Sequence, residues 1–202
     1  MGTMAQIFAK SQIKNGIKKM ESAQKSDGES SDSLFQQAYS KFELVIDNDS
    51  TVIDALHHWA LALTAQAKGK TGQDAEAIFS EASAKYAAAL TIAPNNHEIL
   101  NDWGAALMDQ ARVINPDPAN GLYDQANEKF LAAEKICPGI SAYNLACISS
   151  IRNDPEQCQN FLKTAFEHAN LPQTADMKSD PDLSNFAQAE WFEDFIDSIP
   201  KI

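Results

Sequence analysis

The sequence predicts an all-α protein with the architecture of an α-solenoid, because helical segments repeat along the chain. Rows of 44 residues align three segments without a gap. They are SLFQQAYSKFELVIDND from residue 33, AIFSEASAKYAAALTIA from residue 77 and GLYDQANEKFLAAEKIC from residue 121. Within each segment the apolar residues fall at helical spacing, and Asn, Pro or Gly follows where the pattern stops. A period of this length indicates a stack of similar helical units.

A second kind of helix is expected between these rows, and it has a bulky residue followed by a small one. The pair recurs as Trp59-Ala60, Trp103-Gly104 and Leu145-Ala146. A bulky side chain beside a small one lets a neighbouring helix approach closely while the space around the contact stays filled. Each row and the helix before it therefore form one unit of two packed helices.

The order of these residues resembles the tetratricopeptide repeat, a helix-turn-helix unit. In the second helices of the first three units an Ala precedes an aromatic residue by four positions, as Ala82 precedes Tyr86, and Pro94 and Pro138 end two of these helices. The resemblance implies a single domain over residues 1–202, folded as a right-handed α-solenoid of about four units with a C-terminal capping helix. The 44-residue period exceeds the usual length of about 34. We therefore expect the second helices to begin a turn or two early.

The expected units are residues 9–52, 53–96, 97–138 and 139–172, followed by a loop and the capping helix in 173–202. The first unit has the weakest pattern, with Ile13, Ile17 and Met20 on one stripe of its opening helix and a polar loop at 24–33. Residues 180–196 place Leu183, Phe186, Trp191, Phe192 and Phe195 at helical spacing. We expect them to form one closing helix, because a solenoid must cover its last open face.

Charge is distributed unevenly along the chain. Residues 1–25 contain five Lys and one Glu, which leaves 11 basic and 27 acidic residues in the remainder. An acidic body of this kind repels nucleic acid, so we expect a protein or peptide partner with basic residues. The sequence has neither an apolar run of membrane-spanning length nor a secretory signal, which predicts a cytoplasmic location. The basic amphipathic N-terminal helix leaves association with an organelle or a membrane surface open.

Residues that could perform chemistry are few. Cys137, Cys147 and Cys158 fit neither a disulfide framework nor a paired metal site, and we expect them reduced and mostly buried. His57 and His58 point about 100° apart on a helix, so they cannot chelate one metal ion from there. The common nucleophile, phosphate-binding, zinc-protease and dinucleotide motifs are missing. We therefore expect no enzyme, no catalytic residue, no metal and no cofactor.

In tetratricopeptide arrays the first helices line the concave surface, where segments of partner proteins dock. The resemblance implies a partner-binding groove with twelve residues: Asp54, His57, Leu61, Thr64, Glu98, Asn101, Asp102, Ala105, Met108, Asp109, Tyr143 and Asn144. We expect this groove to be acidic toward its middle.

Some arrays of this family bind the C-terminal carboxylate of chaperones with Lys, Arg and Asn side chains. The corresponding positions here are His57, Leu61, Asp102, Ile140 and Asn144, of which only Asn144 is suitable, so we expect no chaperone tail. The favoured function is an adaptor, scaffold or chaperone-like module that binds a basic or polar segment. The alternative is a self-associating module that builds a homo-oligomer, and an enzyme with an unrecognised site is a distant third.

Overall fold

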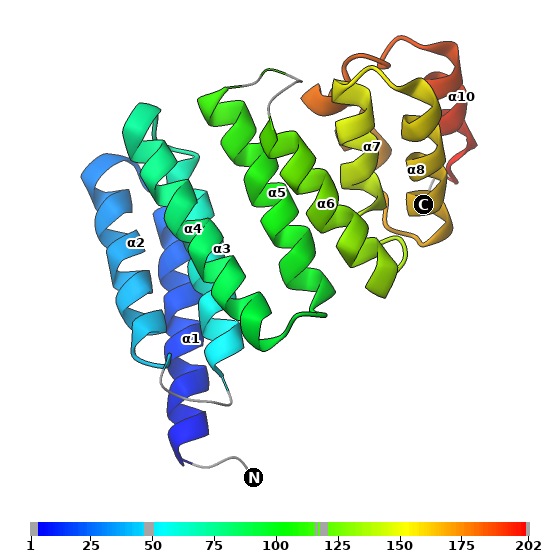
Figure 1. The fold of residues 1–202 in the computed structure, drawn as a ribbon. Helices are drawn as coiled ribbons and strands as arrows, with labels where there is room; N and C mark the ends of the chain where they lie inside the picture. Colours follow the sequence, from blue (N-terminus) through cyan, green and yellow to red (C-terminus); the bar gives the residue numbers. More distant parts are fainter. Residues whose placement is uncertain (1–3, 47–50, 116, 118–120, 201–202) are drawn as a thin grey trace.

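The computed structural model describes residues 4–46, 51–115, 117 and 121–200, and every element in this part of the chain is helical (Figure 1). In chain order the helices are α1 (Met4–Ala23), α2 (Gly28–Glu43), α3 (Val52–Ala67), α4 (Gly72–Ile92), α5 (His97–Ile114), α6 (Gly121–Ile136), α7 (Ala142–Ile151), α8 (Pro155–Glu167), α9 (Thr174–Ser179), the 3-10 helix η1 (Pro181–Leu183) and α10 (Glu190–Ser198). The prediction of an all-α protein is confirmed.

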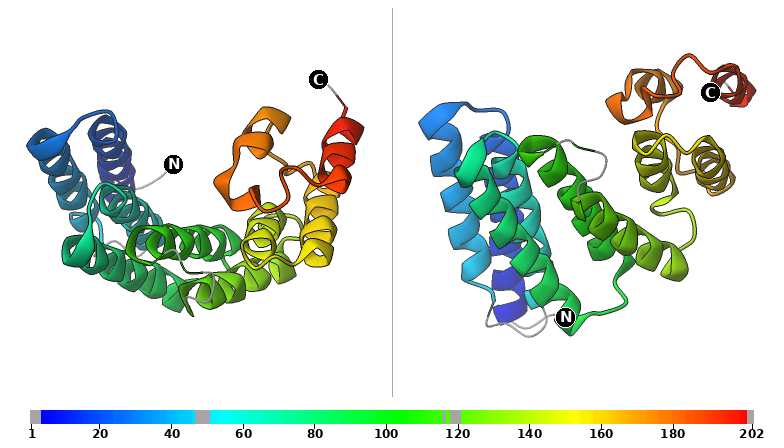
Figure 2. Two further views of the ribbon diagram at one scale, coloured as in Figure 1. Left: turned by 90° about the horizontal axis from the view of Figure 1, so that it is seen from above. Right: turned by 45° about the horizontal axis from the view of Figure 1, so that its top comes forward.

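Consecutive helices pack as antiparallel pairs, and the pairs follow one another along an arc (Figures 1 and 2). Seen from above, α3, α5 and α7 lie on the inner side of the arc, whereas α4 and α6 lie on the outer side. The C-terminal segment with α9 and η1 returns to the inner side next to α7. This arrangement is a helical solenoid with a concave face, as the repeats predicted. The exact unit boundaries given above stay a prediction.

The second helices of the first three pairs begin early, as the long period predicted. Phe35, Phe79 and Tyr123 lie in their first half and are only 3%, 1% and 2% exposed. The expected polar loop at 24–33 was wrong in extent, because α2 already begins at Gly28. The first turns of α2 are polar. Asp32 connects them to the end of α3 and the residues after it, because its carboxylate accepts hydrogen bonds from the side chains of Gln66 and Lys70.

Small residues in the first helices let aromatic residues of the second helices approach the backbone. A Cβ atom added at Gly104 would lie 2.5 Å from Cε1 of Phe130, and one added at Gly16 would lie equally close to Phe42. Gly16 is thus the small residue of the first pair, which the sequence analysis did not assign. Interiors this closely packed tolerate little added volume.

The prediction of one closing helix over residues 180–196 was wrong. The Asp180 side chain accepts a hydrogen bond from the backbone N–H of Asp182, which caps the short η1, and a turn separates η1 from α10. Pro181 starts the new turn because its ring fixes a backbone angle that suits the first position of a helix. Leu183 and Phe192 remain buried at 1% exposure each, so the segment still covers the last pair.

Candidate partner-binding face

Polar side chains connect neighbouring helices across the concave face. His57 of α3 has its Nε2 atom 2.8 Å from Oδ2 of Asp102 in α5. The side chains are 15% and 31% exposed, so the contact lies at the surface and is reached by solvent from the carboxylate side. It joins two adjacent helices of the concave face.

The two adjacent histidines have different surroundings. The ring of His58 stacks on His57, with centroids 5.6 Å apart, and on Phe42 of α2, with centroids 6.4 Å apart. Burial lowers the pKa of His58, and the neighbouring His57 lowers it further. His58 is therefore a packing residue between the two helical layers, whereas His57 belongs to the concave face.

The next pair of concave helices, α5 and α7, is joined by side-chain amides. Oδ1 of Asn101 accepts hydrogen bonds from Oγ of Ser141 at 2.8 Å and from Nδ2 of Asn144 at 3.1 Å. The Glu134 carboxylate accepts from the backbone N–H groups of Gly139 and Ser141 just before α7. The position of α7 is thus fixed from both sides.

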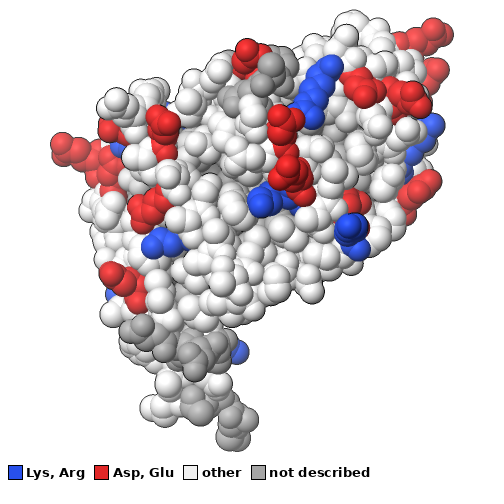
Figure 3. Space-filling view, in the orientation of Figure 1, with Lys and Arg blue, Asp and Glu red and all other residues white. Residues whose placement is uncertain are grey.

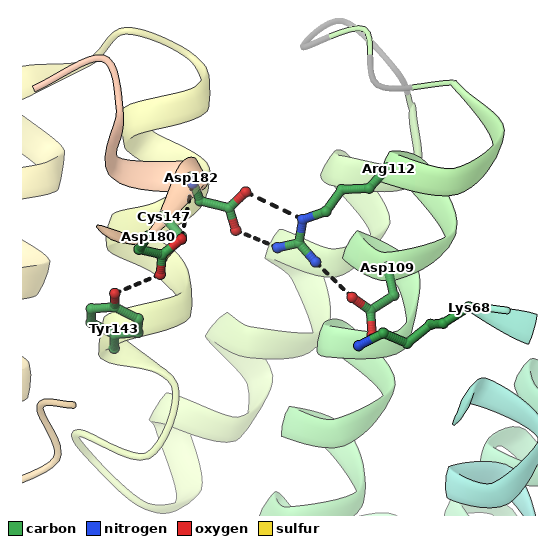
Figure 4. Close-up of polar contacts among 7 residues, drawn as sticks. All are labelled: Lys68, Asp109, Arg112, Tyr143, Cys147, Asp180 and Asp182. Atoms are coloured by element: carbon green, nitrogen blue, oxygen red, sulfur yellow. Dashed lines mark hydrogen bonds and ion pairs between the residues drawn. The ribbon is translucent and has the colours of Figure 1, made fainter. Parts of the chain in front are cut away.

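An ion-pair network crosses the face at the C-terminal ends of α3 and α5 (Figure 4). Nη1 of Arg112 donates to Oδ1 of Asp109 at 2.7 Å, and Nζ of Lys68 lies 3.1 Å from Oδ2 of the same carboxylate. Arg112 also donates to both carboxylate oxygens of Asp182 in η1. Arg112 therefore ties the C-terminal segment to the middle of the solenoid.

The C-terminal segment is also bonded to α7. Tyr143 donates its hydroxyl to Oδ2 of Asp180 at 2.6 Å, and Sγ of Cys147 lies 3.9 Å from the same oxygen (Figure 4). Burial raises the pKa of the Cys147 thiol well above its usual value, and Asp180 raises it further. The cysteine is held as a neutral thiol, which is a poor nucleophile.

The architecture has a counterpart among known families. The family model described as "Plant specific mitochondrial import receptor subunit TOM20" matches residues 32–184, about three quarters of the chain. The chain belongs to the TOM20 family. No curated protein matches it. The match extends from the first turns of α2 to the residue after η1, so it includes α3, α5 and α7 together with Asp180 and Asp182. The resemblance to the tetratricopeptide repeat predicted the helical repeats correctly, but the family whose model matches the chain is TOM20.

Membership of the TOM20 family decides two of the sequence predictions. A family of import receptor subunits acts through protein interaction and not through catalysis, so the protein is not an enzyme. The predicted cytoplasmic location was wrong, because the matching family is mitochondrial. The basic amphipathic N-terminal helix was the sequence feature that had left association with an organelle open. Among the residues that the structure describes, no helix combines the length and the apolar character needed to cross a membrane.

Most of the polar residues predicted for the groove are already engaged in contacts within the chain. His57, Asn101, Asp102, Asp109, Tyr143 and Asn144 take part in the interhelical bonds described above. Met108 is only 2% exposed, so its side chain lies in the core and not on the TOM20 concave surface. Thr64 is half-buried and donates its hydroxyl to the carbonyl of Ala60 at 2.9 Å.

Four predicted residues are left to contact a partner. Asp54 and Glu98 are exposed in the first turns of α3 and α5, and neither is in an ion pair within the part of the chain that the structure describes. Leu61 and Ala105 are half-buried and follow them by seven residues on the same helix faces. Whether these residues bind a partner stays a prediction.

Sequence reasoning missed the residues that hold the C-terminal segment of this TOM20 chain. They are Arg112, Asp180 and Asp182, and it also missed Lys68, which pairs with Asp109 beside Arg112. The pair Asp109 and Arg112 is separated by three positions on one helix, which is a sequence signal for an ion pair. The aspartates gave no such signal, because only the folding of the chain brings them back to α5 and α7.

One group of possible metal ligands lies in the described part of the chain. Ligand atoms of Cys147, Asp180 and Asp182 lie within 4.8 Å of one another. Arg112 occupies both oxygens of Asp182, and Tyr143 and the Cys147 thiol contact the same oxygen of Asp180. Both carboxylates are therefore already engaged, Asp182 by a guanidinium and Asp180 by two neutral hydrogen-bond donors, and the group does not suit a cation.

Proposed function

We propose that the protein is a receptor for targeting segments of proteins imported into mitochondria, and that the concave face of α3 and α5 receives the basic side of such a segment. The observation that supports this most strongly is the match to the mitochondrial import receptor family over residues 32–184. Mitochondrial targeting segments are amphipathic, rich in Arg and poor in acidic residues. A receptor for them needs carboxylates beside an apolar surface.

The carboxylates available for an arginine are Asp54 and Glu98. They are 44 residues apart, so they occupy equivalent positions in neighbouring units. Asp102 and Asp109 already interact with His57, Lys68 and Arg112, and a partner would have to break those contacts. Charge therefore favours docking near the N-terminal ends of α3 and α5.

An apolar strip lies beside these carboxylates. Leu61 and Ala105 stand two turns further along the two helices and are half-buried, so part of each side chain remains available. An amphipathic helix of a partner could place its arginines on Asp54 and Glu98 and its apolar side on this strip. This is the helix-in-groove mode of recognition.

The convex face offers a poorer match to a basic segment. Figure 3 shows this face, where acidic and basic side chains are both scattered and broad areas carry neither. Attraction of a cationic helix needs acidic groups without basic neighbours, because nearby lysines cancel their field. Asp54 and Glu98 on the concave face form no ion pair with a lysine or arginine in the described part of the chain, so they fulfil this condition better.

A fluorescence anisotropy titration with a labelled, Arg-containing amphipathic peptide tests the proposal. In the Asp54→Lys, Glu98→Lys variant we expect binding to weaken by about tenfold or more, because each charge reversal replaces an attraction by a repulsion. The matched control is Glu76→Lys, Glu128→Lys, which makes the same charge change at exposed positions of α4 and α6. Binding should also weaken as salt is added. Equal loss of binding in both variants would overturn this docking site, and no binding by the wild type would overturn the function.

Self-association is the second candidate function, and one observation favours it. Phe166 of α8 is 43% exposed at the C-terminal end of the solenoid, where it packs edge-on against Phe195. Exposed aromatic residues at an open end can form a contact with a second copy. Sedimentation of the wild type and of Phe166→Ser over a range of concentrations distinguishes the two functions, since only self-association predicts a mass that rises with concentration in the wild type alone.

A further inference from the structure

The first two turns of α1 have an apolar surface that the solenoid does not use. Met4, Ile7 and Phe8 are 84%, 59% and 52% exposed. Helical spacing places them as neighbours on the side of α1 opposite Ala9 and Ile13, which pack into the core at 0% and 7% exposure. This end of α1 projects beyond the ends of α2 and α3 (Figure 1). Three large apolar side chains thus lie together at a projecting end of the molecule.

Exposed lysines continue this surface along the helix. Lys10, Lys14 and Lys18 are all exposed, and Lys14 and Lys18 lie on the same side of α1 as Ile7. Residues 1–25 contain five Lys and one Glu, whereas the rest of the chain has 11 basic and 27 acidic residues. The apolar end therefore lies in the one strongly basic part of an acidic protein.

We propose that this end of α1 docks on an anionic membrane surface. Ile7 and Phe8 would enter the boundary between headgroups and acyl chains, and the lysines would lie against the lipid phosphates. Apolar residues beside lysines are the combination that holds helices in the membrane interface without crossing it. A second copy of the chain suits this surface less well, because a symmetric contact would bring the same lysines together. The docking surface shares no residue with the face proposed for targeting segments.

Flotation with lipid vesicles tests this docking. The wild-type chain should float with vesicles of phosphatidylcholine and phosphatidylserine and should bind vesicles of phosphatidylcholine alone much more weakly. The Ile7→Ser, Phe8→Ser variant should lose at least about tenfold in partitioning, because it removes the apolar contacts. The Lys10→Gln, Lys14→Gln, Lys18→Gln variant should lose about fivefold for each lysine and should respond less to salt.

The matched control is the Leu44→Ser, Ile92→Ser variant, which removes side chains of similar exposure, 58% and 51%, just after α2 and at the end of α4. It should bind vesicles like the wild type. Circular dichroism should show the same helix content for all variants, since the changed side chains are exposed. The proposal is overturned if the wild type ignores anionic vesicles or if the control loses as much binding as the Ile7→Ser, Phe8→Ser variant. It is also overturned if the Ile7→Ser, Phe8→Ser variant binds vesicles like the wild type but no longer forms a dimer that the wild type forms.

Discussion

The ammonium nitrogen of Lys85 lies 3.7 Å from the centroid of the Trp59 ring, and Lys129 is placed in the same way over Trp103 at 4.1 Å. In each case the lysine belongs to the second helix of a pair and the tryptophan to the first. Two recurring columns of the sequence therefore meet in space, and the lysine covers the ring as a cation–π partner. At these two positions the lysine column serves packing within a pair of helices.

Replacement of Lys85 by Met tests this contact, because Met keeps most of the apolar stem and removes the charge. We expect Lys85→Met to lower the free energy of unfolding by about 0.5 to 1 kcal/mol, measured by urea denaturation. Lys41 is the matched control. It occupies the same column, but the residue at the tryptophan position of its pair is Asn15, so Lys41→Met should change stability less. Equal effects at the two positions would contradict the role of the ring.

Gly104 is expected to tolerate no side chain. An added Cβ would lie 2.5 Å from Phe130, and overpacking of this kind costs about 1 to 3 kcal/mol, which exceeds the gain of about 1 kcal/mol from the better helix propensity of Ala. Gly104→Ala should therefore lower the midpoint of thermal unfolding. In the control, Gly121→Ala, the added Cβ meets no atom within 4 Å, so the midpoint should stay constant or rise slightly. A midpoint unchanged in Gly104→Ala would show that Phe130 moves aside freely.

The fold could be predicted from the sequence wherever burial determines the residue pattern. The segments around Tyr86 and Phe130 alternate apolar and polar residues at helical spacing, because one face of each helix is buried between its neighbours. The start of α2 and the C-terminal segment were predicted wrongly because their ends depend on hydrogen bonds of single polar side chains and not on a pattern of apolar residues. Asp32 and Asp180 form those bonds, the first with residues far along the chain and the second with the backbone next to it.

The concave face was predicted in outline, but the contacts between its residues were not. His57 bonds to Asp102 over 45 residues, and Asn144 bonds to Asn101 over 43, so both pairs are separated by about one period of the repeat. The alignment of the repeats showed which residues recur along the chain. Because residues about one period apart occupy equivalent positions in neighbouring units, the same alignment also shows which residues lie side by side. No such rule exists for Arg112 and Asp182, because the C-terminal segment does not belong to the repeat.

Arg112 is expected to hold the C-terminal segment on the solenoid. Arg112→Gln removes its ion pairs to Asp109 and Asp182, and hydrogen exchange in residues 174–189 should become about threefold to tenfold faster. The contact of Tyr143 with Asp180 remains, so the segment should loosen without unfolding. Arg152→Gln is the control, since Arg152 has a similar exposure but pairs with Asp124 on α6. If Arg152→Gln accelerates exchange in the same segment equally, Arg112 has no special role there.

His58 gives the protein a predictable pH dependence. Burial, reinforced by His57, lowers its pKa below the ordinary value of 6.5, so the unfolded chain takes up this proton at a higher pH than the folded chain. The stability from neutral His58 is therefore fully present above that value and is lost as the pH falls below it, through the lowered pKa of the folded chain. His58→Phe keeps a ring against Phe42 and should flatten this decline in the unfolding free energy. The hydrogen bond from Lys70 lowers the pKa of Asp32, so its contribution to stability changes with pH only below its ordinary pKa of 3.8. Asp32→Asn should therefore leave the decline unchanged. An equally steep decline in His58→Phe would assign it to another group.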